Sequence, residues 1–117
     1  MSKVGHFVTD PANGVYCHIT LDGGDKILVS HDKGSFESGH LAVERSKWMG
    51  LSSERLFSLD LDTEHGRAAM RRLTAGADAG SAWATPLGAL VEYVKDCRTA
   101  DEVKQRGDAL FSERRAA

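Results

Sequence analysis

Three short runs of β-branched and aromatic residues open the chain, at residues 4 to 8, 15 to 21 and 26 to 32. Clusters of Asp, Gly, Pro and Asn separate these runs, which is typical of strands joined by turns. In the middle run the side chains alternate between two faces, Val15, Cys17, Ile19 and Leu21 on one and Tyr16, His18 and Thr20 on the other. The pattern predicts a three-stranded meander whose middle strand turns its aliphatic face to the core.

The two turns of this meander decide which residues of neighbouring strands lie opposite each other. Residues 10 to 14 read Asp-Pro-Ala-Asn-Gly and have the composition of an open β-turn. Residues 22 to 25 read Asp-Gly-Gly-Asp and predict a hairpin with a two-residue loop. Such a loop sets Tyr16 opposite His31, and the second face of the sheet then becomes half apolar. On that face we expect Val8, Tyr16, Ile27 and Val29.

The segments at residues 40 to 49 and 56 to 62 are predicted to have different secondary structures. Residues 40 to 49 place five side chains at helical spacing, those of Leu41, Ala42, Arg45, Trp48 and Met49. Gly50 follows as a natural helix end. Residues 56 to 62 alternate again, with Phe57, Leu59 and Leu61 on one side. We therefore expect a helix followed by a fourth strand.

Three amphipathic helices are predicted in the remainder of the chain. The first begins after Asp62 or Thr63, either of which can cap it, and its inner side is formed by Gly66, Ala69, Met70 and Leu73. The second begins at Pro86, with Thr85 as its cap. The third begins at Thr99, where Glu102 completes a capping box.

This order of elements, β-β-β-α-β-α-α-α, predicts a single α+β domain over residues 1–117. We expect a four-stranded, mainly antiparallel sheet with the helices packed on one face. The connection to the fourth strand is long enough for a right-handed crossover, which favours the strand order 3-2-1-4 with 1-2-3-4 as the alternative. The radius of gyration should be roughly 13 Å.

Composition narrows the class of protein. A chain of 117 residues and 12.7 kDa, 41% hydrophobic and 27% charged, has the length and composition of one folded domain. A net charge of −2 argues against general nucleic-acid binding, and the short apolar stretches argue against a membrane span. We expect a cytoplasmic protein whose two cysteines, Cys17 and Cys97, are buried thiols.

The strand histidines are the candidate metal ligands. With the expected turns, His6, His18 and His31 lie on one sheet face within a few residues of one another. Three imidazoles with an open fourth position would form a zinc site of the catalytic type. The alternative is three separate histidines with structural hydrogen bonds, because a slip of one residue in the register moves a side chain to the other face.

Two other patterns have simpler structural interpretations. Asp60 and Asp62 form a carboxylate pair of the kind that lies beside Mg²⁺ in phosphohydrolases, and Asp62 can instead cap the following helix. The run Ser30-His31-Asp32 contains the residue types of a catalytic triad, but neighbours on a strand point to opposite faces. We therefore predict no catalytic residue and no cofactor.

Two functional hypotheses remain. In the first, the protein is a non-catalytic binding or assembly module, a homodimer or the partner of another protein, that docks through Tyr16, Ile27 and Val29 and through Trp83. In the second, it binds a small molecule or a metal, or is a small enzyme, with a site between the histidines and the loop that carries Trp83.

Overall fold

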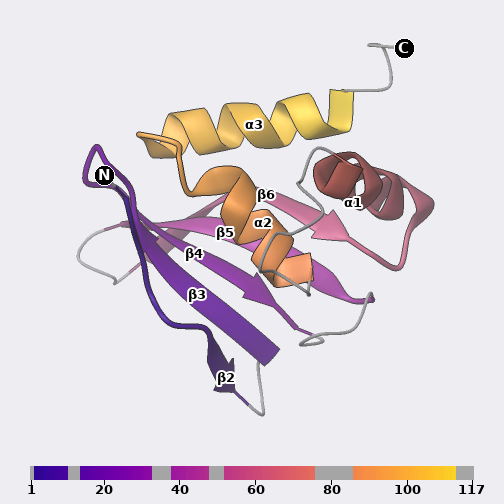
Figure 1. The fold of residues 1–117 in the computed structure, drawn as a ribbon, viewed down its shortest axis with the longest axis horizontal. Helices are drawn as coiled ribbons and strands as arrows, with labels where there is room; N and C mark the ends of the chain where they lie inside the picture. Colours follow the sequence, from indigo (N-terminus) through magenta and orange to yellow (C-terminus); the bar gives the residue numbers. More distant parts are fainter. Residues whose placement is uncertain (1, 11–13, 33–37, 48–51, 76–85, 113–117) are drawn as a thin grey trace.

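A computed structural model describes residues 2–10, 14–32, 38–47, 52–75 and 86–112 (Figure 1). In this part of the chain, six strands precede three helices. The strands are β1 (Lys3–Val4), β2 (Val8–Asp10), β3 (Gly14–Thr20), β4 (Lys26–His31), β5 (His40–Lys47) and β6 (Ser52–Asp60). The helices are α1 (Glu64–Ala75), α2 (Pro86–Val94) and α3 (Ala100–Ser112). The predicted α+β class with an antiparallel sheet is confirmed, but the sheet has six strands where four were expected.

The strands follow one another across the sheet in chain order. The order is β1-β3-β4-β5-β6, with β2 also pairing to β3, and every pair is antiparallel. The predicted order 3-2-1-4 with a parallel crossover is therefore wrong, and the sequential alternative describes the sheet better. The predicted first strand is divided into β1 and β2, which are separated by residues 5 to 7.

The predicted helix over residues 40 to 49 is wrong, because residues 40–47 form strand β5. Leu41 and Val43 are both fully buried, which fits a period of two, whereas the predicted helical stripe contained Leu41 without Val43. Both edges of β5 are paired, to β4 and to β6, and these tertiary contacts override a local pattern that was ambiguous. The residues that would have ended the helix, Trp48 to Gly50, lie outside the described residues.

The hairpin between β3 and β4 has a three-residue loop in place of the predicted two-residue loop. The Leu21 N–H donates to the Asp25 carbonyl at 2.8 Å, and the Gly24 N–H donates to the Leu21 carbonyl at 2.9 Å. Gly24 has a φ of 99°, which only glycine adopts without strain. The extra loop residue shifts the register by one, so Tyr16 lies opposite Ser30, and His31 lies opposite Val15.

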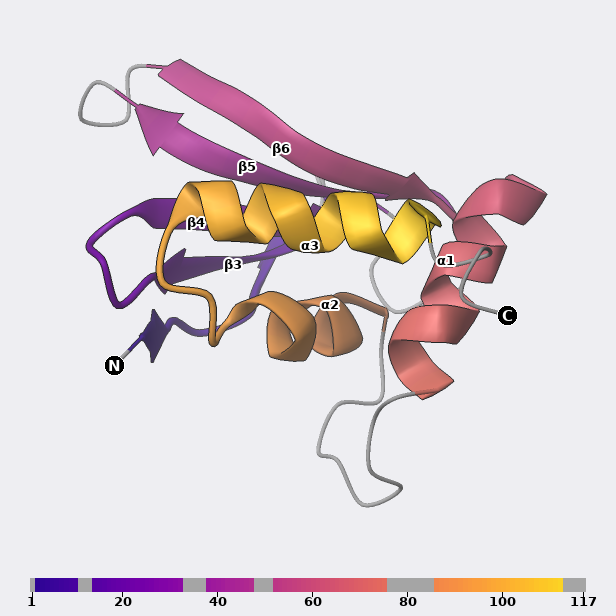
Figure 2. The ribbon, with the colours of Figure 1, turned by 90° about the horizontal axis from the view of Figure 1, so that it is seen from above.

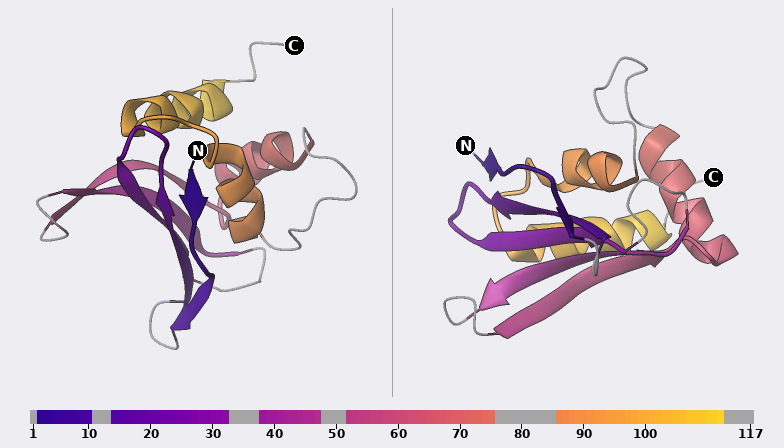
Figure 3. Two further views of the ribbon diagram at one scale, coloured as in Figure 1. Left: turned by 60° about the vertical axis from the view of Figure 1, so that its left-hand side comes forward. Right: turned by 90° about the horizontal axis from the view of Figure 1, so that it is seen from below.

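All three helices cover the same face of the sheet, as Figure 2 and the left view of Figure 3 show. The core between the two layers takes residues from β3 to β6 and from each helix. The radius of gyration is 13.5 Å, close to the predicted value. Among the described helices, none has both the length and the apolar character that crossing a membrane requires.

The helix starts agree with the sequence-based prediction where the structure describes them. Thr63 Oγ1 accepts the Gly66 N–H at 3.1 Å and caps α1. Thr99 Oγ1 accepts the Glu102 N–H at 3.2 Å at the start of α3. Pro86 is the first residue of α2, and Thr85, its predicted cap, lies outside the described residues.

Candidate functional site

The three histidines predicted to form a metal site do not converge. His31 is fully buried and lies on the core face, since its cross-strand partners are Val15 and Leu41. His18 is exposed on the other face, and His6 is exposed between β1 and β2. The expectation of one shared face is wrong, because the hairpin register moves His31 to the side opposite His18. Within the described ranges, no three His, Cys, Asp or Glu side chains are grouped so that they could hold a metal ion.

His31 has a structural role at the end of β4. Its Nε2 donates to the Ser38 carbonyl at 2.8 Å. This hydrogen bond connects the residues just before β5 to the core. Its Nδ1 is buried and has no hydrogen-bond partner among the described residues. An unpartnered polar atom in the core lowers the stability of the folded state. Packing between Val15 and Leu41 and the hydrogen bond to Ser38 must offset this cost.

The residues predicted to bind a partner are also divided between the two faces. Ile27 and Val29 are fully buried on the core face, beneath the helices, so a docking surface that includes them is not formed. Tyr16 is half-buried on the helix-free face, where its ring lies edge-on to that of His18 at a centroid distance of 5.6 Å. Trp83 lies outside the described residues. Of the predicted set, only Tyr16 is placed on the uncovered side.

Exposed apolar side chains gather at one edge of the sheet, on β1 and β2 and on the segment between them. In the described part of the chain, the large apolar side chains that stand out as exposed are Phe7 at 47%, Val4 at 42% and Val8 at 40%. Val8 lies directly opposite Tyr16 on the helix-free face, and Val4 lies opposite Ile19, whose side chain faces the core, so the edge carries apolar side chains on both faces. We call Val4, Phe7 and Val8 the apolar edge.

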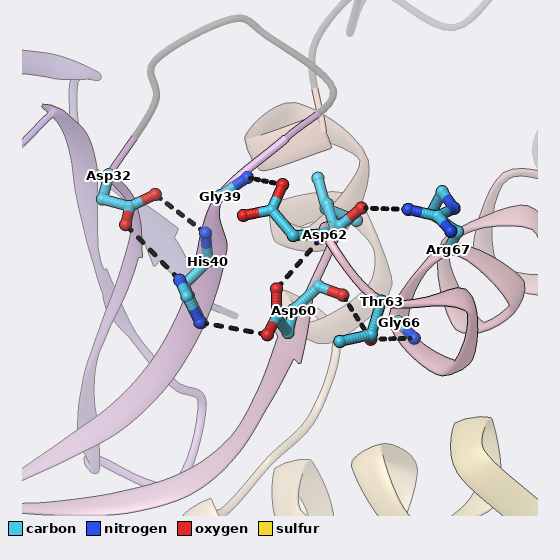
Figure 4. Close-up of polar contacts among 9 residues, drawn as sticks. Asp32, Gly39, His40, Asp60, Asp62, Thr63, Gly66 and Arg67 are labelled. Atoms are coloured by element: carbon cyan, nitrogen blue, oxygen red, sulfur yellow. Dashed lines mark hydrogen bonds and ion pairs between the residues drawn. The ribbon is translucent and has the colours of Figure 1, made fainter.

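A polar cluster lies at the ends of β4, β5 and β6 (Figure 4). The imidazole of His40 lies between two carboxylates, with Nε2 at 3.2 Å from Asp60 and Nδ1 at 3.6 Å from Asp32. The His40 N–H donates to Asp32 at 2.8 Å. Because the His40 side chain is 61% exposed, these pairs are screened by water and contribute little stability.

Asp62 extends this cluster, and its role differs from the predicted helix cap. Its carboxylate accepts the Gly39 N–H at 3.1 Å, while its own N–H donates to the Asp60 carboxylate at 3.0 Å. Thr63, the other candidate, caps α1 instead. Asp60 and Asp62 therefore connect the ends of neighbouring strands to each other.

Both cysteines are buried free thiols, as expected. Burial raises the pKa of Cys17, and it raises the pKa of Cys97 to about 11. Neither thiol is ionised at neutral pH, so neither has the reactivity of a nucleophile or a metal ligand.

Sequence reasoning missed the two surface groups that the structure reveals. The prediction of a helix at residues 40 to 49 separated His40 from Asp32 and Asp60 in space. The apolar edge was missed because the run from Val4 to Val8 looks like an ordinary half-buried strand. Comparison of the chain with models of protein families, with curated proteins and with solved structures found no match.

Proposed function

We propose that the protein is a non-catalytic binding module that associates with a second copy of itself through the apolar edge. The observation that carries this proposal is the exposure of Val4, Phe7 and Val8 on neighbouring positions of a sheet edge. A group of exposed large apolar side chains is a usual sign of an association surface.

The position of the apolar edge suits association. β1 and β2 lie at the end of the sheet, where an edge strand offers backbone groups to another chain. Both strands are short, two and three residues, so few ladder hydrogen bonds can form there. Side-chain packing of Phe7 and the two valines should therefore contribute most of the affinity.

A symmetric pairing of two apolar edges is favoured over a head-to-tail pairing. The opposite edge strand, β6, carries Glu54 and Arg55, which form ion pairs with Lys47 at 3.3 Å and Glu44 at 3.6 Å. In a head-to-tail pairing, Phe7 of one copy would cover the charged side chains of β6 in the other. These charged groups would lose water and gain no hydrogen-bond partner, which is unfavourable. A twofold contact brings apolar groups together and closes the assembly as a dimer.

Sedimentation velocity over about a hundredfold range of concentration tests this proposal. We expect the mass to rise towards twice 12.7 kDa for the native chain. Phe7→Asp should remain monomeric and folded by circular dichroism. Ala109→Asp, an exposed position on α3, is the matched control and should dimerise like the native chain.

A native chain that stays monomeric throughout, or a dimer that persists in folded Phe7→Asp, would overturn self-association through this edge. A cytoplasmic location is part of the proposal, since buried reduced thiols are typical of proteins in reducing compartments. The alternative, binding of a small molecule, is supported by a hollow beside the β3–β4 hairpin, which includes His18 but neither His6 nor His31.

A further inference from the structure

A hollow of about 580 Å³ lies beside the β3–β4 hairpin. This volume is within the range of small-molecule sites. The polar residues that line it are His18, Thr20, Asp25, Lys26, Arg45 and Ser46. They come from β3, β4, β5 and the hairpin turn, so the site exists only when the sheet is assembled.

The register of the sheet concentrates positive charge at this hollow. Thr20 lies opposite Lys3 on one side and opposite Lys26 on the other. Residues directly opposite each other share a face, so the side chains of both lysines lie on the same face as Thr20. In the described part of the chain neither lysine forms an ion pair.

Among the described residues, Asp25 is the carboxylate that lines the hollow, and it is already engaged. Its Oδ2 accepts the Ala100 N–H at 2.8 Å, and its Oδ1 lies 3.6 Å from Nη2 of Arg45. Arg45 lies opposite Ile27, whose side chain faces the helices, so this ion pair lies on the helix side of the sheet. Arg45 therefore compensates the charge of Asp25, and Asp25 does not cancel the charge of Lys26.

We propose that this hollow binds the phosphate or carboxylate group of a small organic anion. Lys26 supplies a charge-assisted donor, the hydroxyls of Thr20 and Ser46 supply neutral donors, and Lys3 adds positive charge on the neighbouring strand. Because Asp25 is compensated by Arg45, the unpaired lysines favour an anion over a cation or a neutral molecule. The volume of the hollow suits a single small molecule. The site does not depend on self-association, since Lys3 and Val4 are neighbours on β1 and point to opposite faces.

Titration of ¹⁵N-labelled protein with inorganic phosphate, and separately with succinate, tests the proposal by NMR at constant ionic strength. We expect saturable shifts of the backbone amides of Thr20, Lys26 and Ser46, with millimolar affinity for one of the two probes. The probe that binds more tightly shows whether the natural group is a phosphate or a carboxylate.

Substitutions separate a built site from general charge attraction. Lys26→Gln removes a charge that has no partner in the described structure, and it should weaken binding about tenfold. Arg71→Gln removes the same charge from α1, at the opposite end of the molecule (Figure 2), and should leave binding unchanged. Phe7→Asp should also leave binding unchanged, which keeps this test independent of dimer formation.

Three results would overturn the proposal. The first is the absence of saturable shifts up to about 50 mM of either probe. The second is an equal response of Lys26→Gln and Arg71→Gln, which would indicate screening of the whole surface. The third is equal, weak binding of both probes that chloride displaces at the same concentration.

Discussion

The carboxylate of Asp25 accepts a 2.8 Å hydrogen bond from the backbone N–H of Ala100, a residue 75 positions later in the chain. Ala100 is the first residue of α3, so a residue of the β3–β4 turn satisfies one of the helix donors that have no partner within the helix. The same carboxylate lies beside Arg45 of β5. One side chain therefore connects the sheet to the helix layer.

Removing this long-range cap should destabilise the protein. Asp25→Ala leaves the Ala100 N–H without its acceptor, and we expect a loss of about 1 to 2 kcal/mol in the free energy of unfolding, measured by urea denaturation. Asp25→Asn keeps an acceptor oxygen and should lose less. Thr99→Ala, which removes the local cap of the same helix, is a reference of about 1 kcal/mol. An Asp25→Ala variant as stable as the native chain would contradict the assigned role.

The close approach of α3 to β6 depends on Gly107. A Cβ at this position would lie 2.4 Å from Cγ and Cδ1 of Phe57, which is too close for either ring atom. Gly107→Ala should therefore destabilise the fold by about 1 to 3 kcal/mol through overpacking. This is the opposite of the gain that Gly→Ala gives on an open helix surface.

A second substitution tests whether Phe57 is the reason. Phe57→Ala removes the two ring atoms at the contact, so the double variant should lose at least about 0.5 kcal/mol less than the sum of the single losses. Asp108→Ala, at an exposed position next to Gly107, should change stability by less than about 0.5 kcal/mol. Strict additivity of Gly107→Ala and Phe57→Ala in thermal or urea unfolding would exclude the contact as the cause.

The buried thiol of Cys97 should make the protein sensitive to alkali. Burial raises its pKa from 9.0 to about 11, so the unfolded chain loses the thiol proton at a lower pH than the folded chain. The stability that the protonated, buried thiol contributes is complete below pH 9 and is lost as the pH rises through 11. At pH 10 the free energy of unfolding should have fallen by about 1.4 kcal/mol from this cause. The measurement compares urea unfolding at pH 8 and pH 10 for the native chain and Cys97→Ala. The variant should lose less stability, and equal losses would count against this assignment.

Asp96 and Arg106 join the end of α2 to α3. Nη1 of Arg106 donates to Asp96 at 2.5 Å and to the Tyr93 carbonyl at 2.7 Å. The hydrogen bond from Arg106 lowers the pKa of Asp96 below its ordinary value of 3.8. Stability from this pair is therefore present above pH 3.8 and is lost as the pH falls through the lower, folded-state pKa.

The size of this acid effect should be small, because the Asp96 side chain is 65% exposed. After allowance for screening by water, we expect the native chain to lose about 0.5 to 1 kcal/mol more than Asp96→Asn between pH 7 and pH 3. Urea unfolding at the two pH values measures this difference. Lys47→Gln, at a surface ion pair with Glu54 on the sheet, is the control and should lose as much stability as the native chain.

Local patterns in the sequence were sufficient for much of the fold. The alternation from Val15 to Leu21 predicts β3, and the alternation from Phe57 to Leu61 predicts the second half of β6. Thr63, Pro86 and Thr99 predict the three helix starts. Each of these signals acts over a few residues, through a cap, a fixed φ or one buried face, so no distant contact was needed to interpret it.

The candidate sites could not be predicted in the same way. The hollow at Lys26 and Arg45 depends on β5 being a strand, and residues 40 to 47 satisfy helical and strand spacing alike. The metal hypothesis depended on the register at His31, and the Asp-Gly-Gly-Asp turn is compatible with loops of two or three residues. In both cases the deciding contacts come from other strands, which a local pattern does not contain.

By itself, the sequence determined that this chain forms an α+β fold with aliphatic strand faces and amphipathic helices, because periodicity and capping are properties of neighbouring residues. Only the tertiary structure decided on which face of the sheet each side chain of β4 lies. Pairing of β5 on both edges and one extra loop residue at Gly24 put Ile27, Val29 and His31 into the core. The same register brought Lys3 and Lys26 together beside Thr20, since cross-strand neighbours are chosen by the assembled sheet.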